Sequence, residues 1–418
     1  MLREMNLEPK ALIEPIDNLY KNSAKKVARG ANTFAFKFSA ALVKNSGYEN
    51  FICSPFSIWL PLAALANAAD KKIRKKLISA IGASGIETDI INCAVSRMLF
   101  DLTKLRDIQG VIEHNEIAVE HGLELLKHHN PLKIVNAIFV SNDMTIKEKF
   151  AQTFINNYRG NTINVDFNSD ETVRAVNQWA SDNTNEMIKE IVRKFDPLTV
   201  ATIGNAIYYS DRWMWELERS DTKEDVFFSP NKTSHAYYML REGDEQIYYE
   251  DKNIQAIQLD FKTGGELLIV LPKNGNATGL LSSMTSEYFN RILNSAWCSS
   301  GRLLLPRFSI ESKIMALEGT LTSLGVPIFG DGNTSHINNL IEEDIPIRFS
   351  STVQKAVINV DEDGTTAAAV TVAVYYTGIP RSTEPFEMIC NKPFVFILSD
   401  YTYDGEKQVL FTGVVNQP

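Results

Sequence analysis

The chain has 418 residues, 44% of them apolar and 22% charged, which are ordinary values for a globular protein. Its 42 basic and 51 acidic side chains give a formal net charge of −9, which argues against a nucleic-acid-binding protein. No run of about 18 apolar residues occurs, so the sequence predicts no membrane span.

The N-terminal segment 1–30 carries charges throughout and has no apolar stretch of signal-peptide length. We expect it to be an extension, partly disordered, that precedes one large domain over 31–418. Either the protein is not exported by a cleaved signal, or the numbering starts after such a signal has been removed.

Helices are expected in the first part of the chain. Apolar residues at helical spacing predict a helix over 31–44. The almost wholly apolar segment 54–69 predicts a buried helix with Ser54 as its N-cap. A strand is expected over 134–141.

The middle of the chain combines helices with a strand of unusual burial. A short helix over 150–160 is expected to end at Gly160. A longer amphipathic helix is expected over 170–192. The segment 200–210 is apolar on both faces, which predicts a strand at the centre of a sheet.

The sequence after residue 225 has mainly the pattern of strands. Two apolar runs separated by Gly264 and Gly265 predict a β-hairpin. A helix over 313–326 is expected to end at Gly325. Further strands are expected over 354–360, 392–399 and 408–415. Because helices and strands mix along the whole chain, we expect one large α+β domain.

Motifs of catalytic and cofactor sites are absent. The sequence has no G-x-S-x-G, H-E-x-x-H, phosphate-binding or dinucleotide-binding pattern, so we expect neither an enzyme nor a cofactor. His114, His121 and His128 recur every seven residues and could share a helix face that binds a metal. A solvated helix is the simpler interpretation, and we expect no metal site.

The cysteines show neither a CxxC pair nor zinc-finger spacing, so free thiols, some of them buried, are expected. They are Cys53, Cys93, Cys298 and Cys390.

Two surface features have competing interpretations. The strongest basic run could bind a polyanion such as a glycosaminoglycan, or could simply be a solvated helix face. It consists of Lys71, Lys72, Arg74, Lys75 and Lys76. Three N-glycosylation sequons matter only in a secretory pathway. They lie at Asn231, Asn276 and Asn333.

The segment 361–388 is long for a connection between two strands, yet it is composed like a strand. Small residues alternate in it, and strand side chains alternate between faces, so one face could enter a packed sheet. These residues are Thr365, Ala367, Ala369, Thr371 and Ala373. Gly364 would let the backbone pivot. An ordinary exposed β-ribbon would also fit this composition.

Several ordered motifs make the chain resemble the serpin family of protease inhibitors, from about residue 32 to the C-terminus. The motifs are FICSPFSI (51–58), NAIYYSDRW (205–213), KAVINVDEDGTTAAA (355–369), NKPFVFIL (391–398) and FTGVV (411–415). The resemblance implies a main mixed β-sheet, further smaller sheets, about eight or nine helices and an exposed reactive-centre loop over about 362–389.

The family works as a suicide substrate, so the resemblance implies the same mechanism here. A serine protease cleaves the loop and forms an acyl-enzyme, and the freed loop then inserts into the main sheet and distorts the protease. The implied hinge residues are Glu362, Gly364, Thr365, Ala367, Ala368 and Ala369. The implied sheet-opening residues are Ser54, Ser57, Asn205, Trp213 and Gln354, the last in place of a histidine that is common in the family.

Arg381 is the only basic residue between Gly364 and Asn391, so we expect the Arg381–Ser382 bond to be the reactive site for a trypsin-like protease. The usual family spacing would put this bond three residues earlier. A longer loop could weaken inhibition and favour simple cleavage. The alternative is a non-inhibitory serpin that acts as a binding or carrier module.

The resemblance and the sequence together lead to expectations about partners and location. The expected partner is a trypsin-like serine protease, held covalently by a monomeric inhibitor. The arginine at the reactive site favours an extracellular or cell-surface protein, whereas the lack of a recognisable signal peptide favours the cytoplasm.

Overall fold

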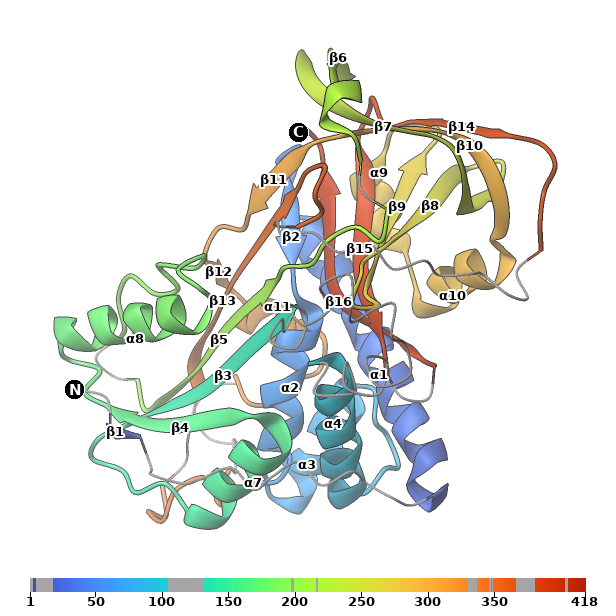
Figure 1. The fold of residues 1–418 in the computed structure, drawn as a ribbon. Coiled ribbons are helices and arrows are strands. Elements are labelled where there is room, and N and C mark those ends of the chain that lie inside the picture. The colour runs from blue at the N-terminus through green and yellow to red at the C-terminus, as the bar shows by residue number, and fades with distance from the viewer. Residues whose placement is uncertain are drawn as a thin grey trace, which may run out of the picture.

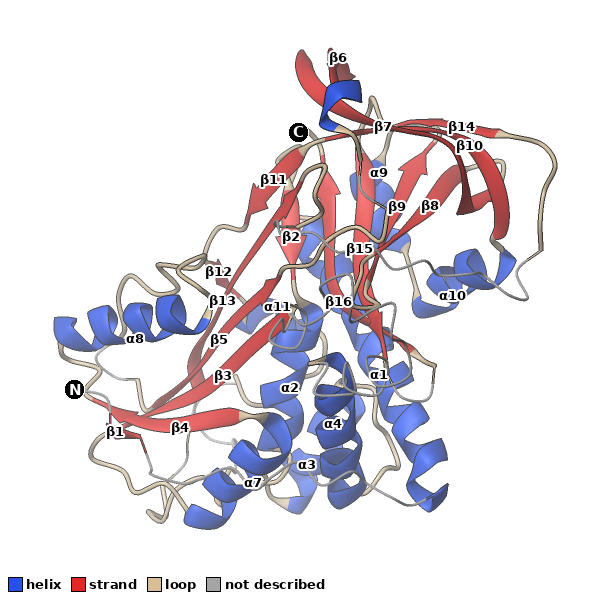
Figure 2. Cartoon of the chain, in the orientation of Figure 1, coloured by secondary structure: helices blue, strands red, loops and turns tan. Residues whose placement is uncertain are grey.

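The computed structural model describes residues 3–4, 18–103, 131–196, 199–215, 217–329, 337–345, 347, 349–365, 380–402 and 405–418. Over these ranges the chain forms nine α-helices and sixteen β-strands. A cluster of helices lies at one end of two sheets, and one helix covers the outer face of the first sheet (Figures 1 and 2). The α+β class and the expected number of helices are confirmed over the described residues.

The first sheet is mixed and has seven strands. Its order is β1 (Arg3–Glu4), β4 (Gly160–Val165), β3 (Leu132–Ser141), β5 (Ala201–Tyr209), β13 (Phe349–Val360) and β11 (Phe308–Glu311), with β12 (Met315–Ala316) also paired to β13. β3 and β5 are antiparallel, whereas β5 and β13 are parallel and hydrogen-bonded directly to each other.

The central position expected for 200–210 is confirmed, because all nine residues of β5 are buried. Helix α2 (Pro55–Leu65) contacts one side of β3 and β5, and α8 (Asp170–Asn183) contacts the same two strands from the other side. A sheet covered on both faces favours strands that are apolar throughout.

The second sheet has nine strands. They are β14 (Phe386–Ile389), β10 (Trp297–Pro306), β7 (Thr233–Glu250), β8 (Ile254–Asp260), β9 (Glu266–Pro272), β15 (Phe394–Tyr401), β16 (Lys407–Val415) and β2 (Phe51–Cys53), with β6 (Lys223–Phe228) also paired to β7. The expected hairpin is β8–β9, and Gly264 in its turn has a φ of 102°. β7 is long enough to pair with β6, β10 and β8.

The remaining helices pack against these sheets. They are α1 (Asn18–Val43), α3 (Lys71–Ala80), α4 (Thr88–Leu102), α7 (Glu148–Tyr158), α9 (Ala277–Ser283), α10 (Ser286–Ser295) and α11 (Glu318–Ser323). The helix expected over 31–44 is the second half of α1, so the boundary expected at residue 31 falls inside a helix. Val27 and Ala28 already belong to the buried core.

The helix expected over 170–192 is shorter than its amphipathic pattern suggested. α8 ends at Asn183, because Asn185 and Glu186 adopt positive φ values of 52° and 60°. The amide of Asn177 then binds the returning backbone, and its Oδ1 accepts from the N–H of Ile191 at 2.8 Å. Side chain-to-backbone bonds of this kind compete with helix continuation.

The helix expected over 313–326 is also only partly right. Met315 and Ala316 form β12, which pairs with β13, and α11 starts at Glu318. Pairing with the sheet outweighs local helix propensity here. The expected end is confirmed, since Gly325 has a φ of 86°.

At two helix ends the residues do not play the roles expected from the sequence. Ser54 lies at the N-cap of α2, but its hydroxyl donates to the carbonyl of Leu410 at 2.7 Å and does not cap the helix. The left-handed residue after α7 is Arg159, with a φ of 50°, not Gly160. Gly160 begins β4, where a Cβ would lie 2.2 Å from the ring of Phe154.

Candidate functional site

The segment 361–365 forms a tight joint where the chain leaves β13 beside the end of β5. Gly364 has a φ of 121°, and a Cβ at this position would lie 2.4 Å from the carbonyl oxygen of Asp211. Glycine is therefore required by both the backbone conformation and the lack of space. The pivot role expected at Gly364 stays a prediction.

Thr365 is buried directly after the pivot. Its backbone N–H donates to the carbonyl of Asp211 at 2.7 Å, and its hydroxyl also contacts the backbone of Asp211. Only 3% of its surface is exposed. The first of the alternating small residues is therefore buried, and the inward face expected for the rest of the series stays a prediction.

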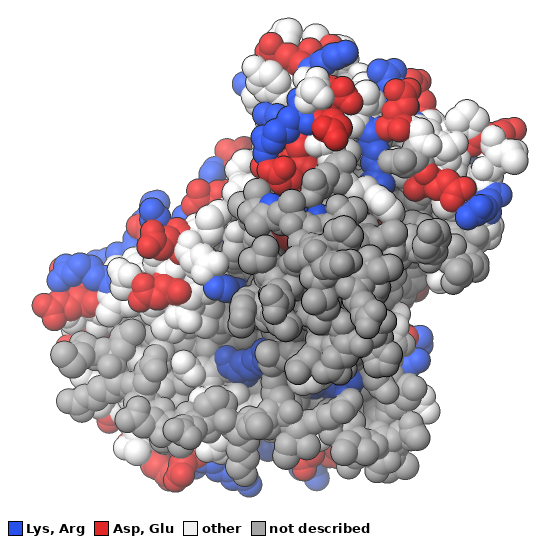
Figure 3. Space-filling view, viewed as in Figure 1, with Lys and Arg blue, Asp and Glu red and all other residues white. Residues whose placement is uncertain are grey.

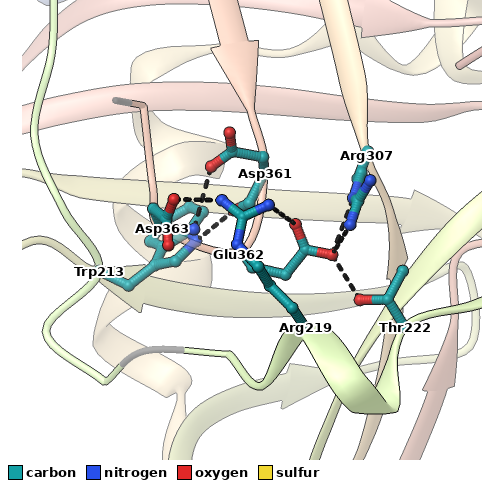
Figure 4. Close-up of polar contacts among 7 residues, drawn as sticks. All are labelled: Trp213, Arg219, Thr222, Arg307, Asp361, Glu362 and Asp363. Atoms are coloured by element: carbon teal, nitrogen blue, oxygen red, sulfur yellow. Dashed lines mark hydrogen bonds and ion pairs between the residues drawn. The ribbon is translucent and has the colours of Figure 1, made fainter. Parts of the chain in front are cut away.

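Glu362 anchors the joint through a buried carboxylate. Arg307 Nε donates to it at 2.7 Å, Thr222 donates its hydroxyl to the same oxygen, and Arg219 lies 3.9 Å from the other oxygen (Figure 4). Burial alone would raise the pKa of Glu362, but the hydrogen bonds from Arg307 and Thr222 outweigh it and lower the pKa. The carboxylate is thus held ionised.

Trp213 supports the same joint through hydrogen bonds and ring stacking. Its indole N–H donates to the carbonyl of Asp361 at 2.8 Å, and its backbone N–H donates to the carbonyl of Asp363 at 3.2 Å (Figure 4). Its ring stacks on Phe261 with 4.6 Å between centroids. Trp213 therefore belongs to the joint. It is not part of the group formed by the other four residues expected to control sheet opening.

Those four residues form one polar cluster between α2 and the β5–β13 pair, which we call the shutter cluster: Ser54, Ser57, Asn205 and Gln354. Gln354 Nε2 donates to the carbonyl of Ser54 at 2.6 Å and to Ser57 Oγ at 2.8 Å. Asn205 Nδ2 donates to the carbonyl of Ser57 at 3.0 Å. All four residues have no exposed surface.

Asn205 and Gln354 are direct partners in the register of β5 and β13. They tie both strands to the start of α2, so the strands can separate only by disturbing these bonds. Asn136 of β3 extends the cluster, because its Oδ1 accepts from Asn205 Nδ2 at 2.6 Å. A polar residue inside the strand 134–141, which is otherwise apolar up to Ser141 at its end, was the sequence signal that could have identified it.

Arg381 and Ser382 follow the end of the joint by 16 and 17 residues and lie beside the beginning of β10. The side chain of Arg381 is 69% exposed and lies 3.3 Å from a carboxylate oxygen of Glu245. Cys298 of β10 is hydrogen-bonded to the backbone on either side of Arg381. Both partners, Glu245 and Cys298, come from strands remote in the chain, so sequence patterns did not indicate them.

Several expected features lie outside the described residues. These are the loop residues Ala367, Ala368, Ala369, Thr371 and Ala373, the histidines His114, His121 and His128, and the sequon at Asn333. Of the other sequons, Asn231 and Asn276 are exposed. Asn276 also caps α9 by accepting from the N–H of Gly279 at 2.8 Å.

The basic run forms the first part of α3, and its four lysines share an exposed face: Lys71, Lys72, Lys75 and Lys76. Arg74 is different, because its guanidinium donates to the carbonyls of Ala66 and Ala69. Around β6 and β7, in contrast, acidic and basic side chains are interspersed (Figure 3).

The four cysteines are free, and all except Cys93 are buried, as expected. Within the described ranges there is no group of three residues that could hold a metal ion. Nor does any helix there have the length and apolar character needed to cross a membrane.

Comparisons with known proteins agree with this geometry. The family model described as "Serpin (serine protease inhibitor)" matches residues 29–418. A serpin-like protein of Thermococcus kodakarensis is 29% identical, covering 96% of this chain and 88% of its own. Antichymotrypsin-2 of Bombyx mori is 28% identical, covering 94% and 98%.

Among solved structures, the native state of the thermophilic serpin tengpin is similar, with a TM-score of 0.76 and 24% identity. The likeness covers 99% of this chain and 98% of tengpin. This similarity concerns the fold.

Proposed function

The chain belongs to the serpin family of serine protease inhibitors, and on this basis we propose that it traps a trypsin-like serine protease as a suicide substrate. The reactive bond in this proposal is Arg381–Ser382. The observation that carries it is the direct pairing of β5 with β13, next to a joint that starts the loop at Thr365.

Parallel neighbours leave a suitable place for the cleaved loop. A chain that turns back at Gly364 would run antiparallel to both β5 and β13, so one inserted strand could pair with each of them. The two strands would have to separate first, and the shutter cluster is the set of buried polar bonds that resists this. The uninserted state is then metastable, as released-strain inhibition requires.

Register predicts where each loop residue would lie after insertion. Thr365 lies beside Asp211. An inserted strand would run antiparallel to β5, so residue 371 would lie beside residue 205. By the same count, residue 375 would reach the beginning of β5 at Ala201. The inward residues up to that level are small except for Tyr375, which supports insertion over most of the strand.

The reaction itself would be ordinary acyl transfer that stops halfway. The protease serine attacks the carbonyl carbon of Arg381, the bond to the nitrogen of Ser382 breaks, and that nitrogen leaves as a free amine. Arg381 remains esterified to the protease. Insertion of the loop then carries the protease away from its own catalytic geometry before water can release it.

Loop length decides between inhibition and simple cleavage. Six residues, 376–381, would extend past the beginning of β5 and serve as a tether to the protease. A slack tether would leave the protease less distorted, and the acyl-enzyme would then hydrolyse. The small residues at the hinge favour inhibition, because bulky or charged residues there would block insertion.

The decisive experiment mixes the protein with trypsin at near-equal molar amounts and analyses the products on a denaturing gel. A band at the summed mass that survives boiling would support a covalent trap. Arg381→Ala should lose this band and Arg381→Lys should retain it. Cleavage with full residual trypsin activity would instead favour the substrate reading of the loop.

A carrier role is the second candidate, and a cavity favours it. An open cavity of about 840 Å³ lies between α1, α10 and the second sheet. Its lining combines apolar side chains with charged side chains of both signs, including Phe261, Leu293, Arg29, Lys407 and Glu406. Arg29 is paired with Glu406 and Lys407 with Glu266, so the lining would suit an amphiphilic small molecule whose polar group competes for these pairs. Saturable binding of an anilinonaphthalene sulfonate dye, lost in Leu293→Arg, would support this role.

We also propose that the α3 lysines bind a sulfated polysaccharide, which would place the protein outside the cell or at its surface. The four exposed ammonium groups form no ion pair with any described residue. Charge without a local partner is available to an external polyanion.

A further inference from the structure

The proposed reactive bond is attached to the body of the protein by a short β-bridge. The N–H of Cys298 donates to the carbonyl of Pro380 at 2.7 Å, and the N–H of Ser382 donates to the carbonyl of Cys298 at 2.9 Å. Cys298 is at the beginning of β10, where pairing with β14 has not yet started. The bridge therefore fills an edge of the sheet that would otherwise be open.

The bridge is secured on its C-terminal side. The bridge pairs Cys298 with Arg381, and the first pair of β10 with β14 is Gly301 with Phe386. Between these two pairs the loop therefore has two more residues than β10. Ser299 Oγ holds this bulge by donating to the carbonyl of Glu384 at 2.7 Å. Arg381 is thus fixed to β10 by the chain that follows it.

The side chain of Arg381 is held as well. Its Nη2 lies 3.3 Å from Glu245 Oε2, and the thiol of Cys298 donates to the same oxygen at 3.5 Å. Burial, and then the carboxylate of Glu245, raise the pKa of the Cys298 thiol, so it stays protonated and able to donate. Glu245 therefore connects the guanidinium to the strand edge that already holds the backbone.

We propose that Glu245 and Cys298 form a clamp on Arg381, and that Glu245 is a positioning residue that slows the engagement of a trypsin-like protease. This inference rests on the proposed function, because it takes Arg381 as the bait. A protease of this class binds the arginine through a carboxylate in its specificity pocket. The guanidinium must therefore leave Glu245 before it can enter that pocket.

The same clamp acts on the step after cleavage. Loop insertion moves the chain on the N-terminal side of the broken bond, so the carbonyl of Pro380 must leave the N–H of Cys298. The clamp thus sets how readily the loop is attacked and how readily it departs, while Arg381 itself stays largely exposed.

The test compares Glu245→Gln with Glu242→Gln, a matched control on the same strand whose side chain is also exposed. The second-order rate of reaction with trypsin should rise about two- to fivefold in Glu245→Gln, the range expected for removing an exposed ion pair. It should not change in Glu242→Gln. The difference should shrink at high salt, because ions screen the pair.

Hydrogen exchange tests the clamp without any protease. In the wild type the amide of Ser382 should be protected, and in Glu245→Gln it should exchange faster. Free exchange of this amide in the wild type, or equal trypsin rates in all three proteins, would overturn the clamp. A protected amide in a protein that trypsin never cleaves at Arg381 would support the clamp and refute the proposed reactive bond.

Discussion

The hydroxyl group of Thr365 lies 2.6 Å from the backbone nitrogen and 2.9 Å from the carbonyl oxygen of Asp211. Asp211 lies just beyond the end of β5, so Thr365 already takes the place that the first residue of an inserted strand would have. The loop is therefore anchored at the open end of the β5–β13 pair, and insertion would continue from this contact.

Ala367→Glu should convert the protein from an inhibitor into a substrate. By register residue 367 would lie beside Tyr209 after insertion, so the variant would bring an unpaired carboxylate into the closed sheet, which costs well over 1.4 kcal/mol and should slow insertion by about tenfold or more. The gel assay with trypsin should show cleaved protein and little covalent complex. Ala367→Ser keeps a small side chain and should trap trypsin as the wild type does; an unchanged yield of complex in Ala367→Glu would contradict the proposed insertion.

Glu362→Gln should lower the free energy of unfolding by about 2 kcal/mol at pH 7, the range for a hydrogen bond to a charged group. The folded-state pKa of Glu362 is lowered, so its stabilisation is complete above the unfolded value near 4.3 and is lost as pH falls through the folded value. Denaturant midpoints should therefore differ between the two proteins at pH 6–8 and converge only as the pH falls below the unfolded value and through the lowered folded value.

Asp363→Asn is the control for that experiment. Its carboxylate pairs with Arg219, whose side chain is 58% exposed, so the loss should stay below about 1 kcal/mol. Equal losses in Glu362→Gln and Asp363→Asn would show that burial of Glu362 adds nothing.

The local parts of the joint could be predicted from sequence, whereas its partners could not. Alternating small residues after Gly364 indicated an inward face, and the buried Thr365 agrees with it. Asp211 is 154 positions from Thr365 in the chain, and Arg307 is 55 positions from Glu362. Nothing in a single sequence states which residues so far apart meet, because that depends on sheet order and register.

The end of α8 shows that a local sequence pattern can also predict more structure than forms. The amphipathic pattern continues through 170–192, but α8 stops at Asn183 because the amide of Asn177 binds the backbone of Ile191 and Val192. A pattern of apolar spacing cannot register such a competing bond. The family motifs succeeded for the shutter cluster because they record contacts between distant segments.

Gln354→His should make stability depend on pH where the wild-type shutter cluster does not titrate. Burial favours the neutral imidazole and lowers its folded pKa below the unfolded value near 6.5. The variant should therefore lose stability as pH falls below about 6.5, by up to about 1.4 kcal/mol for each pH unit. Unfolding midpoints at pH 8 and 5.5, with Gln354→Asn as a neutral control, measure this. An equal pH response in both variants would mean that position 354 is hydrated.

Lys72→Gln/Lys76→Gln should weaken binding to heparin. These lysines are four residues apart on the exposed face of α3. Each contact with a dense polyanion releases about one counterion, so the slope of log affinity against log salt should fall by about two. Elution from a heparin column at several salt concentrations measures it. Lys232→Gln/Lys252→Gln removes two exposed lysines elsewhere and should leave the slope unchanged; the same loss in both would indicate non-specific attraction.

Thr371→Val should destabilise the cleaved protein and leave the uncleaved protein unchanged. In the described structure the buried Oδ1 of Asn205 accepts no hydrogen bond, and register brings Thr371 beside Asn205 only after insertion. The hydroxyl would then satisfy this oxygen, so its loss should cost the cleaved form about 1–3 kcal/mol. Guanidinium midpoints before and after limited trypsin cleavage measure both states. Equal shifts in the two states, or none in the cleaved one, would show that the loop does not insert with Thr371 at Asn205.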